Sequence, residues 1–389
     1  MAKHPWLLSA VVLGLGVASQ PAHAYPWMIK HGYTNCAQCH IDPSGGGILT
    51  DYGRAQGEIL VRTHWKEMTE NPGKKADFAF GAVTLPEPLS LQADLRDLVI
   101  PEPGNVRVIL MQADVRGAVQ AGAFTVSGAI GPVSEGAYAA RITSNTTDPQ
   151  WNLTSREYWA GVSPVKGLMI RAGRMNLPFG LRTEDHELYI RKATRTATNA
   201  DQQTGVSLVY TAKKYRFEVM GIAGNFQVHP DVFRERGYSL YGSYAVSKTF
   251  ELGVSSLLTV AGEDIITLAP RTRQAHGVYT RAAPVESVSV LAEADLLVDK
   301  NNGVNSMGIA GSGIVDWEPT QGLHLMGIGQ YCDPDFSSPD SPAWTGGAAV
   351  QWFFLTRFDV RVDALEGVLS CVAGAKPSPM ALVQGHFYL

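Results

Sequence analysis

From Asp77 to the C-terminus, apolar and polar residues alternate in segments of about ten residues, as in Leu-Ser-Leu-Gln-Ala-Asp-Leu-Arg at 89–96. A side-chain period of two is that of a β-strand whose two faces lie in different surroundings. Other clear segments span 106–119, 168–175, 215–224, 250–258, 288–298 and 343–354. The pattern predicts an all-β chain with about 18 such segments.

The connections between these segments alternate in length. Short ones span 131–135, 163–167, 211–214 and 246–249, and longer ones span 145–155, 176–204, 225–236 and 261–272. Short periplasmic turns and longer external loops are typical of a transmembrane outer-membrane β-barrel with both termini in the periplasm. Since the strand number must then be even, we expect about 18 antiparallel strands, with 16 as the alternative.

Composition agrees with a barrel in a bacterial outer membrane, in contact with its lipid. Charged residues make up only 17% of the chain, glycine occurs 40 times, and the hydrophobic 45% is dispersed, as in alternating strands. The C-terminal Phe387-Tyr388-Leu389 resembles the closing strand of such barrels. The small net charge of −4 argues against a nucleic-acid partner.

The first 24 residues have the parts of a signal peptide. Lys3 and His4 precede an apolar stretch at 6–17, and Ala22-His23-Ala24 is a small-x-small cleavage site. The mature chain is expected to begin at Tyr25. No later segment reaches the roughly 20 apolar residues of a membrane helix.

Residues 36–40 read Cys-Ala-Gln-Cys-His, the pentapeptide that attaches haem c. Cys36 and Cys39 would bond the two vinyl groups of one porphyrin, and His40 would be the proximal iron ligand. A redox dithiol needs a thioredoxin-like βαβ context, and a zinc site needs a second ligand pair nearby. Residues 41–76 supply neither, so we predict one covalent haem c.

The sequence therefore divides into a signal peptide (1–24), a haem c-binding N-terminal segment (25–76) and a barrel (77–389). A segment of this size is too small to surround a haem with its own core. We expect it to plug or cap the barrel lumen, whose interior is wide enough to accept it.

The sixth iron ligand has several candidates. His64 is the favoured one, and Met68 lies one turn further along a helix-like stretch at 51–68. Met28 and His31 precede the haem motif, and His186 in the longest loop is a remote candidate. A histidine ligand would give a lower potential than a methionine ligand.

Signal peptide, single N-terminal haem motif, Leu49-Thr50-Asp51-Tyr52-Gly53-Arg54 and a long barrel together resemble the fused monohaem cytochrome–porins known from iron-oxidising bacteria. The resemblance covers the whole layout but only about thirty residues of motif. It implies that electrons pass between an extracellular donor and periplasmic carriers through the haem. Pro43-Ser44-Gly45-Gly46-Gly47 departs from that family's usual intervening stretch.

A second stretch, Arg171-Ala-Gly-Arg-Met-Asn-Leu-Pro-Phe-Gly180, resembles the phosphate-selective-type porins. The loop that follows carries Arg182, Arg191, Lys192 and Arg195. Folded inward, these side chains would form an anion-attracting constriction. On a solvated loop or polar lumen wall, they would have no such role.

Cys332 and Cys371 both fall near the external end of the predicted barrel. We expect a disulfide between neighbouring loops, since the exterior is oxidising. Two unbonded thiols are the alternative.

These features predict electron transfer across the outer membrane through one haem c, with a periplasmic c-type cytochrome or similar carrier on one side and an external electron donor or acceptor on the other. The alternative is a diffusion porin, anion-preferring in one version, whose haem plug is structural or sensory. A haem peroxidase with an open sixth position ranks lowest, since no distal acid–base pair stands out. We expect an electron-transfer protein rather than an enzyme, and the alternative is a one-electron oxidoreductase that acts on the external donor or acceptor.

Overall fold

The computed structural model describes residues 25–63, 83, 85–102, 104–134, 151–183, 188–198, 200–355, 357–368, 371, 374 and 376–388. The predicted signal peptide and His64, Met68 and His186 lie outside these residues. Among the described residues, no helix is long and apolar enough to cross a membrane.

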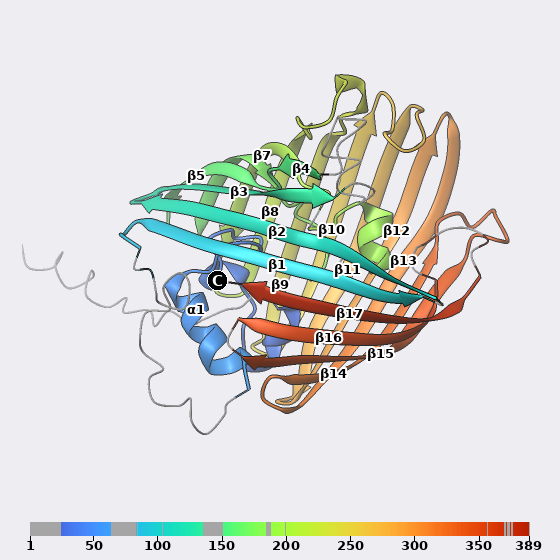
Figure 1. The fold of residues 1–389 in the computed structure, drawn as a ribbon. Helices are drawn as coiled ribbons and strands as arrows, with labels where there is room; N and C mark the ends of the chain where they lie inside the picture. Colours follow the sequence, from blue (N-terminus) through green and yellow to red (C-terminus); the bar gives the residue numbers. More distant parts are fainter. Residues whose placement is uncertain are drawn as a thin grey trace, which may run out of the picture.

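Seventeen strands within the described residues form one antiparallel sheet (Figure 1). They are β1 (Leu89–Glu102), β2 (Asn105–Ala121), β3 (Phe124–Ser134), β4 (Trp151–Thr154), β5 (Tyr158–Val165), β6 (Leu168–Met175), β7 (Gln203–Thr211), β8 (Tyr215–Gly224), β9 (Arg236–Ser247), β10 (Phe250–Ala261), β11 (Arg271–Val285), β12 (Val288–Asn301), β13 (Val304–Thr320), β14 (Leu323–Asp333), β15 (Ala343–Leu355), β16 (Phe358–Gly367) and β17 (Ser378–Tyr388).

The sheet closes on itself because β1 pairs with β17, with Leu95 opposite Phe387. The short β4 pairs with the end of β3, while β5 pairs with the start of the same strand. Without β4, sixteen of the seventeen strands make up the closed barrel. The predicted fold class is confirmed with the alternative count of 16; the count of about 18 is too high. Strands of 17 residues, such as β2 and β13, are longer than the segments counted from the pattern.

The short connection expected at 131–135 is also wrong, because β3 runs through Gly131. A Cβ atom at Gly131 would overlap the backbone carbonyl of Ala113 on neighbouring β2. This glycine therefore permits a close backbone approach within the sheet and does not mark a turn.

The two faces of the strands differ in polarity. On β10, Leu252, Val254 and Val260 are exposed on the outer face, whereas Glu251 and Thr259 are buried on the inner face. An apolar exterior and a polar lining are typical of transmembrane barrels. The fold is consistent with a location in a bacterial outer membrane.

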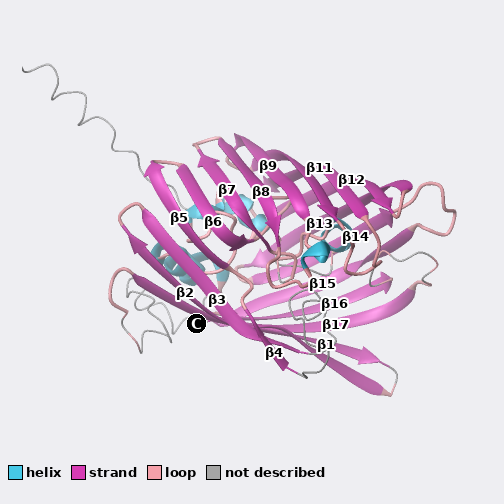
Figure 2. Cartoon of the chain, turned by 90° about the horizontal axis from the view of Figure 1, so that it is seen from above, coloured by secondary structure: helices cyan, strands magenta, loops and turns pink. Residues whose placement is uncertain are grey.

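Short helices of the N-terminal segment and of the β6–β7 loop lie inside the barrel (Figure 2). The N-terminal segment contributes η1 (Pro26–His31), η2 (Cys36–Gln38), α1 (Asp51–Gln56) and η3 (Gly57–Val61). The loop between β6 and β7 contributes α3 (Tyr189–Thr194), and an external loop contributes η4 (Asp231–Phe233). In Figure 1, α1 lies at the same end of the barrel as the C-terminus, which is the periplasmic end in barrels of this kind.

Candidate functional site

The N-terminal segment, here residues 25–63, is attached to the inner wall of the barrel by buried ion pairs. Asp42 accepts a hydrogen bond from Arg171 of β6, and both side chains are almost fully buried. At another point on the wall, the Lys30 ammonium lies 2.5 Å from Glu318 and 3.5 Å from Asp316 of β13. The segment therefore lies in the lumen, where a plug was expected.

Inward-pointing arginines also bind the backbone of this segment. Arg281 of β11 donates to the carbonyl of Thr34 at 2.9 Å, and Arg216 of β8 donates to that of Pro43. In the opposite direction, Arg54 of α1 donates to the Leu91 carbonyl of β1 at 2.5 Å. The bonds from Arg281 and Arg216 satisfy carbonyl groups of the short, irregular segment, which lacks regular secondary structure to pair them.

Apolar contacts complete the docking. Trp27, Met28, Tyr33 and Val61 pack with Phe353 of β15 in one buried cluster. Ile41 and Ile48 belong to a second cluster whose other members come from the barrel wall and the β6–β7 loop: Ala118, Trp159, Met175, Leu177, Phe179, Met220, Ile222, Leu257 and Ala275. The segment thus touches both the wall and the long inner loop.

The haem motif forms a single helical turn, η2. Asn35 caps it by accepting a hydrogen bond from the Ala37 N–H at 3.1 Å. The N–H groups of Cys39 and His40 both donate to the Cys36 carbonyl, at 3.1 and 3.0 Å. Cys36 and Cys39 are buried and not disulfide-bonded. Spacing of three residues on such a turn places both sulfur atoms on the same side.

Residues 49–54 hold this turn in place through hydrogen bonds. The Thr50 N–H donates to the Cys39 carbonyl at 2.7 Å. Its hydroxyl donates to the Gln38 carbonyl at 3.0 Å and accepts from the Gly53 N–H at 3.1 Å, which caps α1. Thr50 and Gly53 therefore connect α1 to the Cys36–His40 turn through hydrogen bonds, which explains their place just after this motif.

His40 is held in one orientation. Its Nδ1 lies 3.3 Å from the Gly47 carbonyl, which can only accept, so Nδ1 carries the hydrogen and Nε2 remains for a metal. Burial lowers the pKa of His40 to about 4, so the ring is neutral near pH 7. A neutral imidazole whose other nitrogen is hydrogen-bonded to a carbonyl is the usual state of an iron-ligating histidine.

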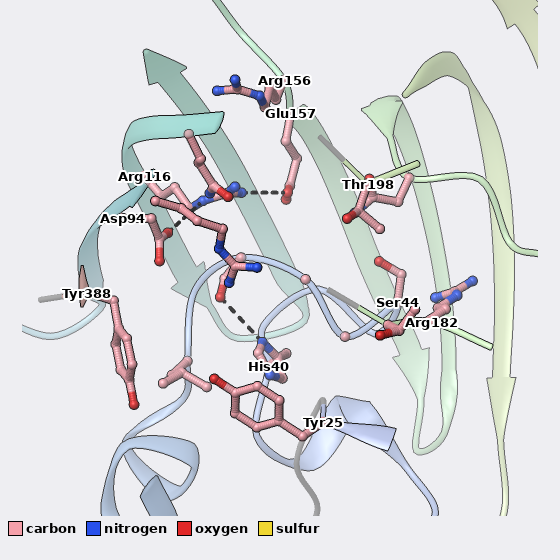
Figure 3. Close-up of a pocket in the computed structure, with 18 of the residues that line it drawn as sticks. Tyr25, His40, Ser44, Asp94, Arg116, Arg156, Glu157, Arg182, Thr198 and Tyr388 are labelled. Atoms are coloured by element: carbon pink, nitrogen blue, oxygen red, sulfur yellow. Dashed lines mark hydrogen bonds and ion pairs between the residues drawn. The ribbon is translucent and has the colours of Figure 1, made fainter. Parts of the chain in front are cut away.

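His40 borders a cavity that encloses about 1320 Å³ of space, part of which opens to solvent. The N-terminal segment, the barrel wall and the β6–β7 loop each form one side (Figure 3). Arg116 of β2 is central to the wall, with Asp94 at 3.0 Å, Asp114 at 3.1 Å and Glu157 at 3.3 Å. The cavity therefore has a polar, charged wall facing His40.

Met28 and His31, the two predicted sixth ligands among the described residues, are not brought to this cavity. Met28 is fully buried in the Trp27 cluster. His31 lies near Glu318, Lys30 and His324, and neither Met28 nor His31 lines the cavity. The predicted helix at 51–68 ends earlier, because Arg62 is extended and the helical residues stop at Val61.

The residues of the barrel wall that line the cavity were not predicted from the sequence. Asp94, Arg116 and His386 come from β1, β2 and β17, far apart in sequence. Their inward positions follow from the alternation of the strands. Which wall would face His40 depends on how the segment docks, and no local pattern encodes that.

The β6–β7 loop folds inward, as its basic residues suggested. However, Arg182 lies 2.8 Å from Glu218, Arg191 pairs with Glu293, and Arg195 lies 2.5 Å from Asp264. Lys192 is exposed. Pairing with carboxylates offsets much of the positive charge that an anion-attracting constriction requires.

The Sγ atoms of Cys332 and Cys371 are bonded in the structure, and their Cα atoms lie 5.8 Å apart. Among the described residues, no group of three or more His, Cys, Asp or Glu side chains is arranged to hold a bare metal ion. A zinc site at Cys36 and Cys39 thus gains no support.

No protein-family model and no curated protein matches the chain. Several solved outer-membrane proteins share its fold. The loop L8 deletion mutant of OmpT from Vibrio cholerae is 9% identical, with a TM-score of 0.59, over 77% of this chain and 99% of that one. The outer membrane channel DcaP of Acinetobacter baumannii is 9% identical, with a TM-score of 0.54, over 77% and 97%. An anion-selective porin from Comamonas acidovorans is 10% identical, with a TM-score of 0.54, over 77% and 99%. Such likeness supports the porin-like barrel and nothing finer.

Proposed function

We propose that Cys36 and Cys39 hold one covalent haem c, with His40 as its proximal ligand, and that the protein transfers electrons across the outer membrane. The observation that carries the proposal is the state of His40, whose Nδ1 is bound to the Gly47 carbonyl while the ring faces a large cavity in the lumen. When bound, the haem supplies reversible one-electron Fe(III)/Fe(II) cycling.

The residues of this chain position that group. Thr50 and Gly53 fix the turn that presents the two sulfur atoms. Arg216 lies 3.6 Å from the Cys36 Sγ, so a positive charge stands beside one attachment point. The buried ion pairs of Asp42 and Lys30 hold the turn inside the barrel. The apolar band that electrons must cross in a barrel of this kind is about 25 Å tall.

One haem spans only part of that distance. We therefore propose an external electron donor or acceptor at one end and a periplasmic c-type cytochrome or similar carrier at the other. The C-terminus and α1 of the N-terminal segment lie at the same end of the barrel, where a periplasmic carrier would have access.

The second candidate is a diffusion porin, with the haem segment as a structural or sensory plug. The likeness to porins, including an anion-selective one, favours this candidate over electron transfer when taken alone. We rank it second because both the N-terminal segment and the β6–β7 loop occupy the lumen.

A liposome assay distinguishes an electron conduit from a diffusion porin. The purified protein is inserted into vesicles that enclose an oxidised reporter dye, an impermeant reductant is added outside, and the haem and reporter absorption bands are followed together. An electron conduit reduces both bands and retains a small entrapped solute. A diffusion porin releases that solute.

The matched variants are His40→Ala, which removes the proximal ligand, and His229→Ala, which changes an exposed loop histidine. Reporter reduction lost only in His40→Ala supports the proposal. Purified protein without covalent haem, or vesicles that leak without reducing the reporter, would overturn it.

A further inference from the structure

His386 lies on β17, on the barrel wall, and borders the same cavity as His40. Contacts connect the two histidines. His40 pairs with Leu49 in a β-bridge, the Leu49 N–H donates to Gln92 Oε1 at 3.0 Å, and Gln92 Nε2 donates to Asp94 at 3.0 Å. Asp94 in turn lies beside His386. The N-terminal segment and the closing strand thus present one imidazole each to one space.

The surroundings of His386 resemble those of a metal ligand. Its Nδ1 lies 3.0 Å from Asp359 Oδ2 on β16. A carboxylate on one ring nitrogen fixes the orientation of a histidine and raises the basicity of the other nitrogen. The Nε2 atom lies 3.9 Å from Asp94 Oδ1, an ion-pair distance, so iron at Nε2 would replace a proton that this second carboxylate favours. The ring also stacks on Tyr388, with centroids 5.3 Å apart.

Other ligand types are scarce around this cavity. Among the described residues that line it, His386 is the single imidazole besides His40, and none is a methionine or a cysteine. Tyr25 and Tyr388 also line it. Either ligand must give up a proton to bind iron, and an imidazolium gives it up far more readily than a phenol does.

We propose that His386 is the distal iron ligand, so that the barrel wall and the N-terminal segment each supply one axial histidine. This inference rests on the proposed haem at Cys36, Cys39 and His40. Docking of the segment would then determine the coordination number of the iron, which would be six only when the segment packs against β17. A bis-histidine haem also has a lower potential than a histidine–methionine haem.

The test is spectroscopic and uses the purified full-length haem protein. Wild type is expected to be low-spin in both oxidation states and slow to bind carbon monoxide. His386→Ala should convert most of the haem to high spin and bind carbon monoxide quickly. Added imidazole should restore the low-spin spectrum, which a merely structural role would not allow.

Two further variants sharpen the result. His386→Met offers iron a thioether and should stay low-spin at a raised potential. His276→Ala is the control, because His276 is another strand histidine, on β11 with Nδ1 2.9 Å from Ser256 Oγ, and does not line the cavity. Its spectrum should equal that of wild type.

A wild-type haem that is already high-spin, or a His386→Ala spectrum identical to wild type, would overturn the inference while leaving the haem and electron transfer in place. A wild-type protein with no covalent haem overturns the proposed function and this inference together. Covalent haem is measured first, on denatured protein, so the two failures are distinguished.

Discussion

Gly53 of α1 lies directly against the Cys39 carbonyl, so closely that a Cβ atom at Gly53 would overlap that oxygen. The helix after the haem motif therefore seats on the motif itself. The close approach depends on the missing side chain and not on an unusual backbone conformation, since residue 53 is helical.

We expect Gly53→Ala to displace the Cys36–His40 turn, because the overlapped atom belongs to the backbone and has little freedom to move. The ratio of covalent haem to purified protein should fall several-fold, while the barrel still folds. Gly221→Ala on β8 is the control, since no heavy atom lies within 4 Å of a Cβ there and Gly221 does not line the cavity. Equal haem content in both variants would contradict this role of Gly53.

Arg171→Met should loosen the N-terminal segment from the barrel. It removes the partner of buried Asp42, whereas Glu218 keeps Arg182 and Arg216. Breaking one side of a buried pair costs about 3–5 kcal/mol, which raises the undocked population by about two to four orders of magnitude. Limited proteolysis of the segment measures this population.

Arg236→Ala is the comparison for that experiment. Arg236 pairs with Asp231 on an external loop, where both side chains are more than half exposed, and such pairs contribute roughly 0–1 kcal/mol. Similar protease sensitivity in both variants would show that the Asp42–Arg171 pair does not hold the segment.

Docking of the N-terminal segment should weaken in mild acid. Burial lowers the pKa of His31 below 6.5, against smaller opposing effects from Glu318 and Glu286 and reinforcement from Lys30 and His324. The contribution of His31 is therefore complete above pH 6.5 and is lost as the pH falls through the lowered pKa, because the released segment binds a proton more readily. Proteolysis at several pH values measures the effect, and His31→Gln should make the profile flatter. An unchanged profile in His31→Gln would exclude this residue as the cause.

The Cys332–Cys371 bond should appear as one joined peptide in a non-reducing digest. It encloses a sequence separation of 39 residues, and the chain-entropy treatment gives about 4 kcal/mol for a loop of that length. Cys332→Ser should thus lower the thermal unfolding temperature and should not change the haem spectrum. Two separate alkylated peptides would show that the thiols are unbonded.

The alternation along 215–224 and 168–175 determined β8 and β6 to the residue, because a strand with one face in lipid and one in a polar lumen repeats every two residues. The short and long connections likewise determined that the chain is a closed barrel. Cys36, Cys39 and His40 predict a covalent haem from the sequence alone, because the spacing of the motif is local. The predicted strand number of about 18 was too high. The alternating pattern does not indicate that some strands are much longer than ten residues, or that β4 and β5 both pair with β3.

Tertiary structure alone decided what faces His40. Asp94, Arg116 and His386 line the same cavity as His40 because β1 closes on β17. The cavity also requires that Asp42, Lys30 and Trp27 hold the N-terminal segment between β6 and the wall formed by β13 and β15. Each of these contacts joins residues distant in sequence, and its free energy depends on burial that exists only in the closed barrel. The alternation in the sequence predicts whether a side chain points into the lumen or outward. Its partner across the lumen depends on closure of the barrel and on docking of the N-terminal segment.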